Sequence, residues 1–244
     1  MKIGIIGLGL IGGSILKALS AQGFETVAVT RNNSAIENAK KFTNFVSSDK
    51  NSIAVCDVVF VCTPVSKTLE TLDELEKIVR PECVVTDVAS VKRFVCAQSR
   101  PFLFVPSHPM AGTEKSGFDA SFPELFVNKK WIFCADENLP EVKTLVEIVE
   151  KIGAIPVFTT SEEHDRAVSL ISHLPVFIAQ TLRKTAQIDD FALSIASSGF
   201  KDTTRVADTN PVLARDMLDF NKDNILSALQ IFKKHLAEFE KSLS

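Results

Sequence analysis

The chain has 244 residues, of which 45% are hydrophobic and 23% are charged, and its formal net charge is -3. This composition excludes a mainly disordered chain, and the slightly acidic balance offers no basic surface for nucleic acid or for an anionic membrane. The five cysteines show no spacing typical of a zinc site, so we expect reduced thiols, no bound metal and a cytoplasmic location. The expected partner is therefore a small molecule.

The N-terminal segment predicts a dinucleotide-binding turn. A short buried strand is expected over residues 2–6 and a helix over residues 14–22, with a G-x-G-x-x-G pattern between them. In that pattern Gly7 permits the tight turn, Gly9 lets the backbone approach a pyrophosphate, and Gly12 lets the helix pack closely on the strand. The cofactor is expected to contact Gly7, Gly9, Leu10, Ile11 and Gly12.

The next strand, expected over residues 25–29, ends at the position where a dinucleotide ribose would lie. NAD-binding domains usually present an acidic residue there, but this chain reads Thr30-Arg31. Arg31 can pair with a 2′-phosphate, aided by the Thr30 hydroxyl, which favours NADP over NAD. In the alternative interpretation Arg31 is a solvated turn residue and the site accepts either cofactor.

Two further apolar strands, expected over residues 57–62 and 83–86, end in polar residues. Ligands of doubly wound sheets bind outside the carboxyl ends of the strands, so Thr63, Asp87 and Ser90 are expected at the cofactor edge.

The two hydroxyls also have a structural interpretation. Thr63 is alternatively the N-cap of the helix after it, and Ser90 the N-cap of a helix expected over residues 91–97.

One histidine lies in a polar, glycine-bearing segment that neither helix nor strand periodicity explains. A strand expected over residues 102–105 runs into the segment 107–118, which contains His108. Pro109 biases His108 toward an extended conformation, and the two glycines that follow let the backbone fold closely around a ligand. His108 is therefore the best candidate for chemistry.

The remaining elements of this half are expected to complete the sheet. They are strands over residues 130–135 and 155–158, with a helix over residues 141–152. Alternating strands and helices predict a parallel α/β, Rossmann-like domain over residues 1–158.

Residues 159–244 predict an all-α domain. The expected helices span residues 165–186, 189–197, 211–218 and 222–241. Several have apolar stripes broader than one small domain can bury, which favours a homodimer formed through this helical dimerisation domain.

Three polar residues of the helical half have two interpretations each. His164 is either a solvated residue of the first helical turn or a functional one, and His173 is either a satisfied core histidine or a substrate contact. Arg205 either pairs with Asp202 at helical spacing or binds a substrate carboxylate.

Five ordered motifs together closely resemble the prephenate/arogenate dehydrogenase family, over essentially the whole chain. They are residues 7–14, the segment 87–92 with its Ser-Val-Lys, residues 107–118, Ser172-His173-Leu174-Pro175 and residues 199–207. The resemblance implies a Rossmann-like domain followed by a helical dimerisation domain, which agrees with the interpretation above.

The resemblance also implies the reaction, an oxidative decarboxylation of a cyclohexadienol that ends in an aromatic ring. By resemblance His108 is the base that accepts the proton of the ring hydroxyl, and Ser90 orients it and touches the substrate. Arg205 would bind the ring carboxylate, and Thr113 and Glu114 would complete the pocket.

Two departures from the family pattern bear on the substrate. Many relatives have a second histidine where this chain has Val176, and some carry tryptophan where it has Ala214. Val176 together with Thr30-Arg31 is more like the NADP-using arogenate dehydrogenases than the NAD-using prephenate enzymes. We expect arogenate and NADP, with prephenate dehydrogenation or a non-catalytic NADP-sensing module as the alternatives.

Overall fold

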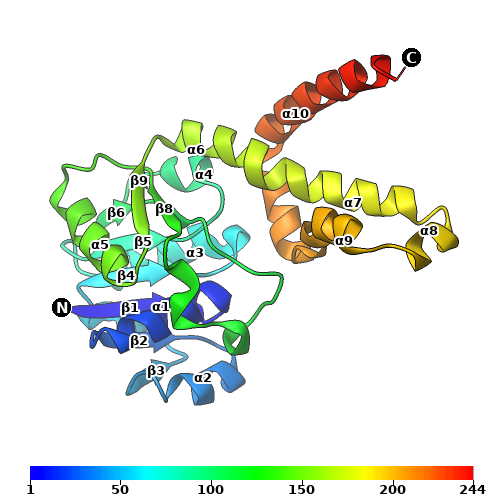
Figure 1. The fold of residues 1–244 in the computed structure, drawn as a ribbon. Coiled ribbons are helices and arrows are strands. Elements are labelled where there is room, and N and C mark those ends of the chain that lie inside the picture. The colour runs from blue at the N-terminus through cyan, green and yellow to red at the C-terminus, as the bar shows by residue number, and fades with distance from the viewer. Residues whose placement is uncertain (244) are drawn as a thin grey trace. The chain divides into compact units, whose positions relative to one another are not determined.

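The structure, a computed structural model, describes residues 1–243. The chain divides into two compact units, Met1–Ser161 and Glu162–Ser244 (Figure 1). The boundary expected from the sequence follows Phe158, at the end of the last strand. In the described residues no helix is both long and apolar enough to cross a membrane.

The first unit is built on a six-stranded sheet in which every neighbouring pair of strands is parallel. In spatial order its strands are β3 (Phe45–Ser47), β2 (Glu25–Val29), β1 (Lys2–Ile6), β4 (Val58–Val61), β5 (Val84–Asp87) and β6 (Leu103–Val105). This order is that of dinucleotide-binding domains, and it confirms the predicted α/β class. Strand β3 was not predicted, because it is three residues long and too short to show a pattern.

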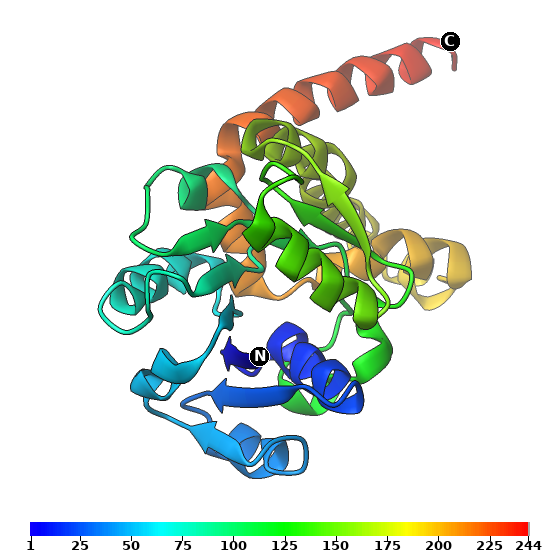
Figure 2. The ribbon, with the colours of Figure 1, turned by 90° about the vertical axis from the view of Figure 1, so that its left-hand side faces the viewer.

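Helices pack on both faces of this sheet. They are α1 (Leu10–Ala21), α2 (Asn33–Ala39), α3 (Val65–Leu75), α4 (Arg93–Cys96) and α5 (Pro140–Lys151). Figure 2 shows α1 (blue) on the same side as α5 (green).

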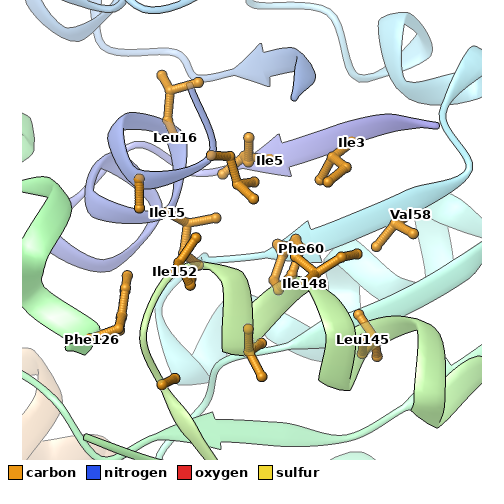
Figure 3. Close-up of a cluster of buried hydrophobic side chains, with 14 of the residues drawn as sticks. Ile3, Ile5, Ile15, Leu16, Val58, Phe60, Phe126, Leu145, Ile148 and Ile152 are labelled. Atoms are coloured by element: carbon orange, nitrogen blue, oxygen red, sulfur yellow. The ribbon is translucent and has the colours of Figure 1, made fainter. Parts of the chain in front are cut away.

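Buried side chains alternate between the two faces of the strands, as the period of two requires. Ile3, Ile5, Val58 and Phe60 pack with α1 and α5 in one apolar cluster (Figure 3). The intervening strand residues, such as Val59, pack with α3 in a second cluster. Each such buried side chain contributes about 1.5–3 kcal/mol of hydrophobic stabilisation.

The other strands of this unit form a second, three-stranded sheet of β7 (Ser107–Pro109), β8 (Lys130–Phe133) and β9 (Ile155–Phe158). Strand β7 is antiparallel to β8, and β9 is parallel to β8. The expectation that residues 130–135 and 155–158 complete the main sheet is therefore wrong. The physical reason is that β8 pairs with the segment around His108 instead of with β6.

The second unit is helical, as predicted. Its elements are α6 (Ser161–Val168), a π-helical turn (Ser169–His173), α7 (Leu174–Ala186), α8 (Asp190–Ser194), α9 (Ser198–Thr204) and α10 (Pro211–Lys241). The single helix expected over residues 165–186 is interrupted by the π-helical turn, which accommodates the missing N–H of Pro175 at the start of α7.

Two other predictions for the helical unit need correction. The helices expected over residues 211–218 and 222–241 form one element, α10, with a non-helical backbone at Asn221. Helix α9 was not predicted, because Ser198, Gly199 and two threonines are poor helix formers.

Candidate functional site

The parallel register aligns the ends of four strands. Val29, Ile6, Val61 and Asp87 are successive register partners on β2, β1, β4 and β5. Ligands of open parallel sheets bind outside this carboxyl edge. The residues that follow these four strands therefore start from one edge of the sheet, as the sequence predicts.

The glycine turn between β1 and α1 combines tight packing with open space. Gly7 has a φ of +93°, and a Cβ on Gly12 would lie 2.0 Å from the carbonyl oxygen of Gly7. A Cβ on Gly9 would meet no atom within 4 Å. Gly7 and Gly12 are thus required by the fold itself, whereas Gly9 faces a space that a ligand can fill.

The N-terminus of α1 opens onto the same space. Leu10 and Ile11 form its first turn, Gly9 is its N-cap residue, and no side chain caps it. The free N–H groups and the dipole of a helix N-terminus favour a negatively charged group. The turn therefore fits the pyrophosphate of a dinucleotide.

Thr63 follows β4 and does not cap a helix. Pro64 is the N-cap residue of α3, without a side-chain hydrogen bond. The Oγ1 atom of Thr63 is buried and has no hydrogen-bond partner among residues 1–243. The capping interpretation is wrong, and the hydroxyl stays available for a ligand.

The end of β2 carries an exposed cation, Arg31. The Thr30 hydroxyl accepts a hydrogen bond from the amide of Asn32 at 3.3 Å, and Asn32 is the N-cap of α2. Arg31 is exposed and forms no hydrogen bond or ion pair within the described part of the chain. With Lys67 as the larger cause, its charge also helps to lower the pKa of the Glu70 carboxyl. An exposed guanidinium of this kind can bind an anion.

Asp87 is the last residue of β5. Its side chain is fully buried and forms an ion pair with the equally buried Lys92. Its Oδ2 atom also accepts the Ala89 amide at 2.9 Å, and its Oδ1 atom accepts the Ser107 amide at 3.3 Å. The carboxylate is therefore enclosed and holds together the backbone around it, and a cofactor contact at Asp87 stays a prediction.

Ser90 lies just beyond β5. The helix expected over residues 91–97 is only the short α4, whose N-cap residue is Lys92, so the capping interpretation of Ser90 is wrong. Its Oγ atom is buried without a hydrogen-bond partner among the described residues. An unpaired buried hydroxyl costs about 1–3 kcal/mol, which a ligand hydrogen bond would offset.

His108 lies on strand β7 and not in a loop. It is half-buried and pairs with Ile132 of β8 in the antiparallel register. The strand was not predicted from the sequence, because it is three residues long and ends in Pro109, which cannot donate a ladder hydrogen bond. A strand gives His108 a fixed backbone.

The loop after β7 carries the two other predicted pocket residues. Thr113 and Glu114 are both exposed, and the Thr113 hydroxyl accepts the Lys115 amide at 3.2 Å. Thr113 and Glu114 thus lie within six residues of His108 in the sequence, on the loop that follows its strand.

The two histidines near the start of the helical unit are buried. His164 is 2% exposed and its Nδ1 atom lies 2.8 Å from Oδ1 of Asp165, so the solvated interpretation is wrong. His173 is fully buried, and its Nδ1 atom lies 3.1 Å from Nδ2 of Asn221. The contact with Asn221 accounts for one of the two ring nitrogens, so both interpretations of His173 stay open.

Arg205 borders an open hollow of about 420 Å³ within the helical unit. It is exposed and, in the described part of the chain, pairs with neither Asp202 nor another carboxylate. The nearby Asp208 is bound by Arg183, whose guanidinium lowers the pKa of that carboxyl. Lys201 also lines the hollow, which therefore offers two unpaired cations to an anion.

The cysteines take no part in this chemistry. All five are free thiols. Burial raises the pKa of the Cys56 thiol to about 11 and that of Cys83 to about 12, so both stay protonated at neutral pH. Across residues 1–243 no cluster of histidine, cysteine and carboxylate side chains could hold a metal ion.

Comparison with known proteins gives a match to each unit. Residues 15–157 match the family described as "Prephenate dehydrogenase, nucleotide-binding domain", and residues 160–244 match "Prephenate dehydrogenase, dimerization domain". A prephenate dehydrogenase of Bacillus subtilis (strain 168) is 32% identical, over 97% of this chain and 68% of its own length.

Two solved structures are similar over the whole chain. Synechocystis arogenate dehydrogenase is 34% identical with a TM-score of 0.83, covering 100% of this chain and 92% of that one. Prephenate dehydrogenase from A. aeolicus, in complex with hydroxyphenyl propionate and NAD+, is 28% identical with a TM-score of 0.89, covering 100% and 90%.

The fold and the glycine turn define a two-domain protein with a nucleotide-binding α/β domain and a helical domain. With both domains matched in order, the chain belongs to the prephenate dehydrogenase family.

The glycine turn predicts opposite behaviour for two single substitutions. Gly12→Ala should lower the melting temperature, because its Cβ would clash with the Gly7 carbonyl. Gly9→Ala should leave the melting temperature unchanged but weaken NADP binding at least about tenfold, because its Cβ enters the space left for the pyrophosphate. Circular dichroism and titration calorimetry measure the two effects. Full NADP affinity in Gly9→Ala would contradict the proposed site.

Proposed function

We propose that the chain is an arogenate dehydrogenase of tyrosine biosynthesis, which oxidatively decarboxylates arogenate to tyrosine with NADP as hydride acceptor. Membership of the family over both domains supports the coarser assignment, a prephenate or arogenate dehydrogenase. Two observations carry the proposal: His108 lies on strand β7, where it is paired with β8, and the Ser90 hydroxyl after β5 is buried without a hydrogen-bond partner among residues 1–243.

The reaction needs one base and carboxylate-binding groups. When bound, the nicotinamide ring accepts the hydride from the ring carbon that bears the hydroxyl. His108 accepts the hydroxyl proton as the hydride leaves. The bond to the ring carboxylate then breaks, carbon dioxide departs with its electrons left in the ring, and the proton returns to the phenol oxygen. Ser90 orients His108 and the substrate hydroxyl, and no net proton is released.

The substrate carboxylates call for cations. Arg205 is unpaired within the described residues and borders a hollow of its own unit, which supports its role as the ligand of the ring carboxylate. Thr113 and Glu114 contribute polar groups from the segment that follows His108. His173 is held by Asn221, so its role is to shape the helical part of the site.

The choice of NADP and arogenate depends on two positions. Arg31 is exposed and follows Thr30, and residues 30–33, which follow β2, include no acidic residue that could accept a ribose 2′-hydroxyl. Val176 is 4% exposed and apolar where many relatives carry a histidine. These residues favour a 2′-phosphate and the arogenate side chain.

The specificity is tested by assaying arogenate and prephenate, each with NADP and with NAD, through the absorbance of the reduced cofactor. We expect the highest kcat/KM for arogenate with NADP. Arg31→Asp should lower kcat/KM with NADP by about tenfold or more and shift the preference to NAD, while Arg31→Lys should keep the NADP preference in part. A wild-type preference for NAD would contradict the proposed contact between Arg31 and a 2′-phosphate. Turnover of prephenate alone would contradict the choice of arogenate. NADP binding without any turnover would indicate a sensing module.

His108→Asn should lower kcat by at least about 10²-fold, because asparagine cannot accept and return the hydroxyl proton. The dissociation constant for NADP should not change, since the glycine turn is untouched. His235→Asn is the matched control, because His235 is exposed on α10 and pairs only with Glu238. A His108→Asn variant with wild-type kcat would remove His108 from the mechanism.

The helical unit forms a homodimer in this proposal. Ile188, Phe191 and Ile195 are exposed by 87%, 71% and 65% in the isolated chain, and exposed apolar groups of this size mark interfaces. Light scattering should give the mass of two copies, and Phe191→Asp should shift the protein toward a monomer. Val55→Asp, at a position 61% exposed in the nucleotide-binding unit, is the control that should stay dimeric. A wild-type monomer would contradict this assembly.

A further inference from the structure

The nucleotide-binding unit contains an ion pair that the proposed reaction does not use. Lys92 and Asp87 are both fully buried and in direct contact. Removing two charges from water costs several kcal/mol per ion, so a buried ion pair is weak grounds for stability alone. Stability alone therefore does not explain why the pair is present, whereas its contacts with the neighbouring backbone suggest a second role.

Both charges bind the backbone of Ser107, the residue that precedes His108. The Lys92 ammonium donates a hydrogen bond to the carbonyl oxygen of Ser107 at 2.5 Å. The Asp87 carboxylate accepts the amide of the same residue at 3.3 Å. The ion pair therefore holds strand β7 through the amide and the carbonyl group of Ser107.

The same carboxylate shapes the turn that carries Ser90. Its Oδ2 atom accepts the Ala89 amide at 2.9 Å while it contacts Lys92, which closes the turn around Ser90. One buried pair thus connects the segments that carry Ser90 and His108. These are the two residues to which the proposed function gives the catalytic roles.

The Ser107 side chain completes the attachment. Its hydroxyl donates to the carbonyl oxygen of Asp87 at 2.8 Å and accepts the indole N–H of Trp131 at 2.9 Å. It also lies 2.8 Å from the Thr86 hydroxyl. Strand β7 is therefore fixed to the end of β5 and to β8 at the same residue.

We propose that the buried Lys92–Asp87 ion pair is the positioning element of the reaction, which holds the Ser90 turn and the His108 strand in their working relation. Neither residue is catalytic in this proposal, since both act through Ser107 and the Ser90 turn. The inference rests on the proposed roles of His108 and Ser90. It differs from a stability role in one respect: turnover must depend on the pair even in a variant whose stability has been restored.

The test compares Lys92→Met, Asp87→Asn and the double variant with wild type. Either single substitution strands one buried charge and should lower the melting temperature, whereas the double variant removes both charges and should recover most of it. The kcat should nevertheless stay about 10²-fold below wild type in the double variant, because a methionine side chain cannot donate a hydrogen bond to the Ser107 carbonyl. The KM and the dissociation constant for NADP should stay within about twofold.

Trp131 supplies a readout that needs no turnover. It is the only tryptophan of the chain, the chain has no tyrosine, and its indole N–H is bound to Ser107. Its emission should therefore change in the double variant if strand β7 shifts. The matched control is Arg100→Met, which removes a cation whose side chain is 1% exposed and which pairs with Asp73 and Glu76 away from β7. That variant should lose stability while keeping kcat and Trp131 emission.

A double variant with wild-type kcat and wild-type Trp131 emission would overturn the proposal and leave the pair a purely structural role. A lowered kcat with unchanged emission would also overturn it, because the effect would not pass through β7. If wild-type protein turns over neither arogenate nor prephenate, the proposed function fails, while Trp131 emission still decides whether the pair holds the strand.

Discussion

The parallel hydrogen-bonded register of β2, β1, β4 and β5 is the constraint on which the nucleotide-binding half of the site depends. Because Val29, Ile6, Val61 and Asp87 are partners in one row, the segments after these strands leave the sheet at the same edge. Backbone geometry alone thus gathers a glycine turn, a threonine, an arginine and a serine from distant parts of the sequence. In the proposed site, small rotations of these side chains are then enough for all of them to contact one ligand.

That edge keeps polar groups unsatisfied, at a cost in stability. The hydroxyls of Thr63 and Ser90 are buried without partners in the described part of the chain. Each costs about 1–3 kcal/mol, yet the strands beside them make continuous apolar clusters that offset the cost. Such a concentration of unpaired groups next to well-packed strands is typical of a ligand site, because a bound molecule supplies the missing partners.

Local patterns in the sequence predict the parts of the fold that depend on neighbouring residues. The glycine turn, the apolar strands and the polar residues at their ends follow from spacing, so the α/β class is recovered. The burial of Asp87 against Lys92 and Ser107 could not be predicted, because these partners are brought together by tertiary contact. Strand β7 was missed for the same reason, since its three residues are defined only by pairing with β8. The same limit applies to α9 and to the π-helical turn before Pro175, where packing overrides helix propensity.

Each of the two domains exposes cations that form no ion pair within residues 1–243. The nucleotide-binding unit places Arg31 and an uncapped helix N-terminus where phosphates are expected, while the helical unit keeps Arg205 and Lys201 free of carboxylate partners within residues 1–243. Asp208 lines the same hollow as these two cations, and Arg183 binds both of its carboxylate oxygens. The partner of Asp208 is therefore Arg183, and the charge of Arg205 is not paired within residues 1–243. In the proposed function, where the acidic side chains of this hollow are directed matters as much as where its cations lie.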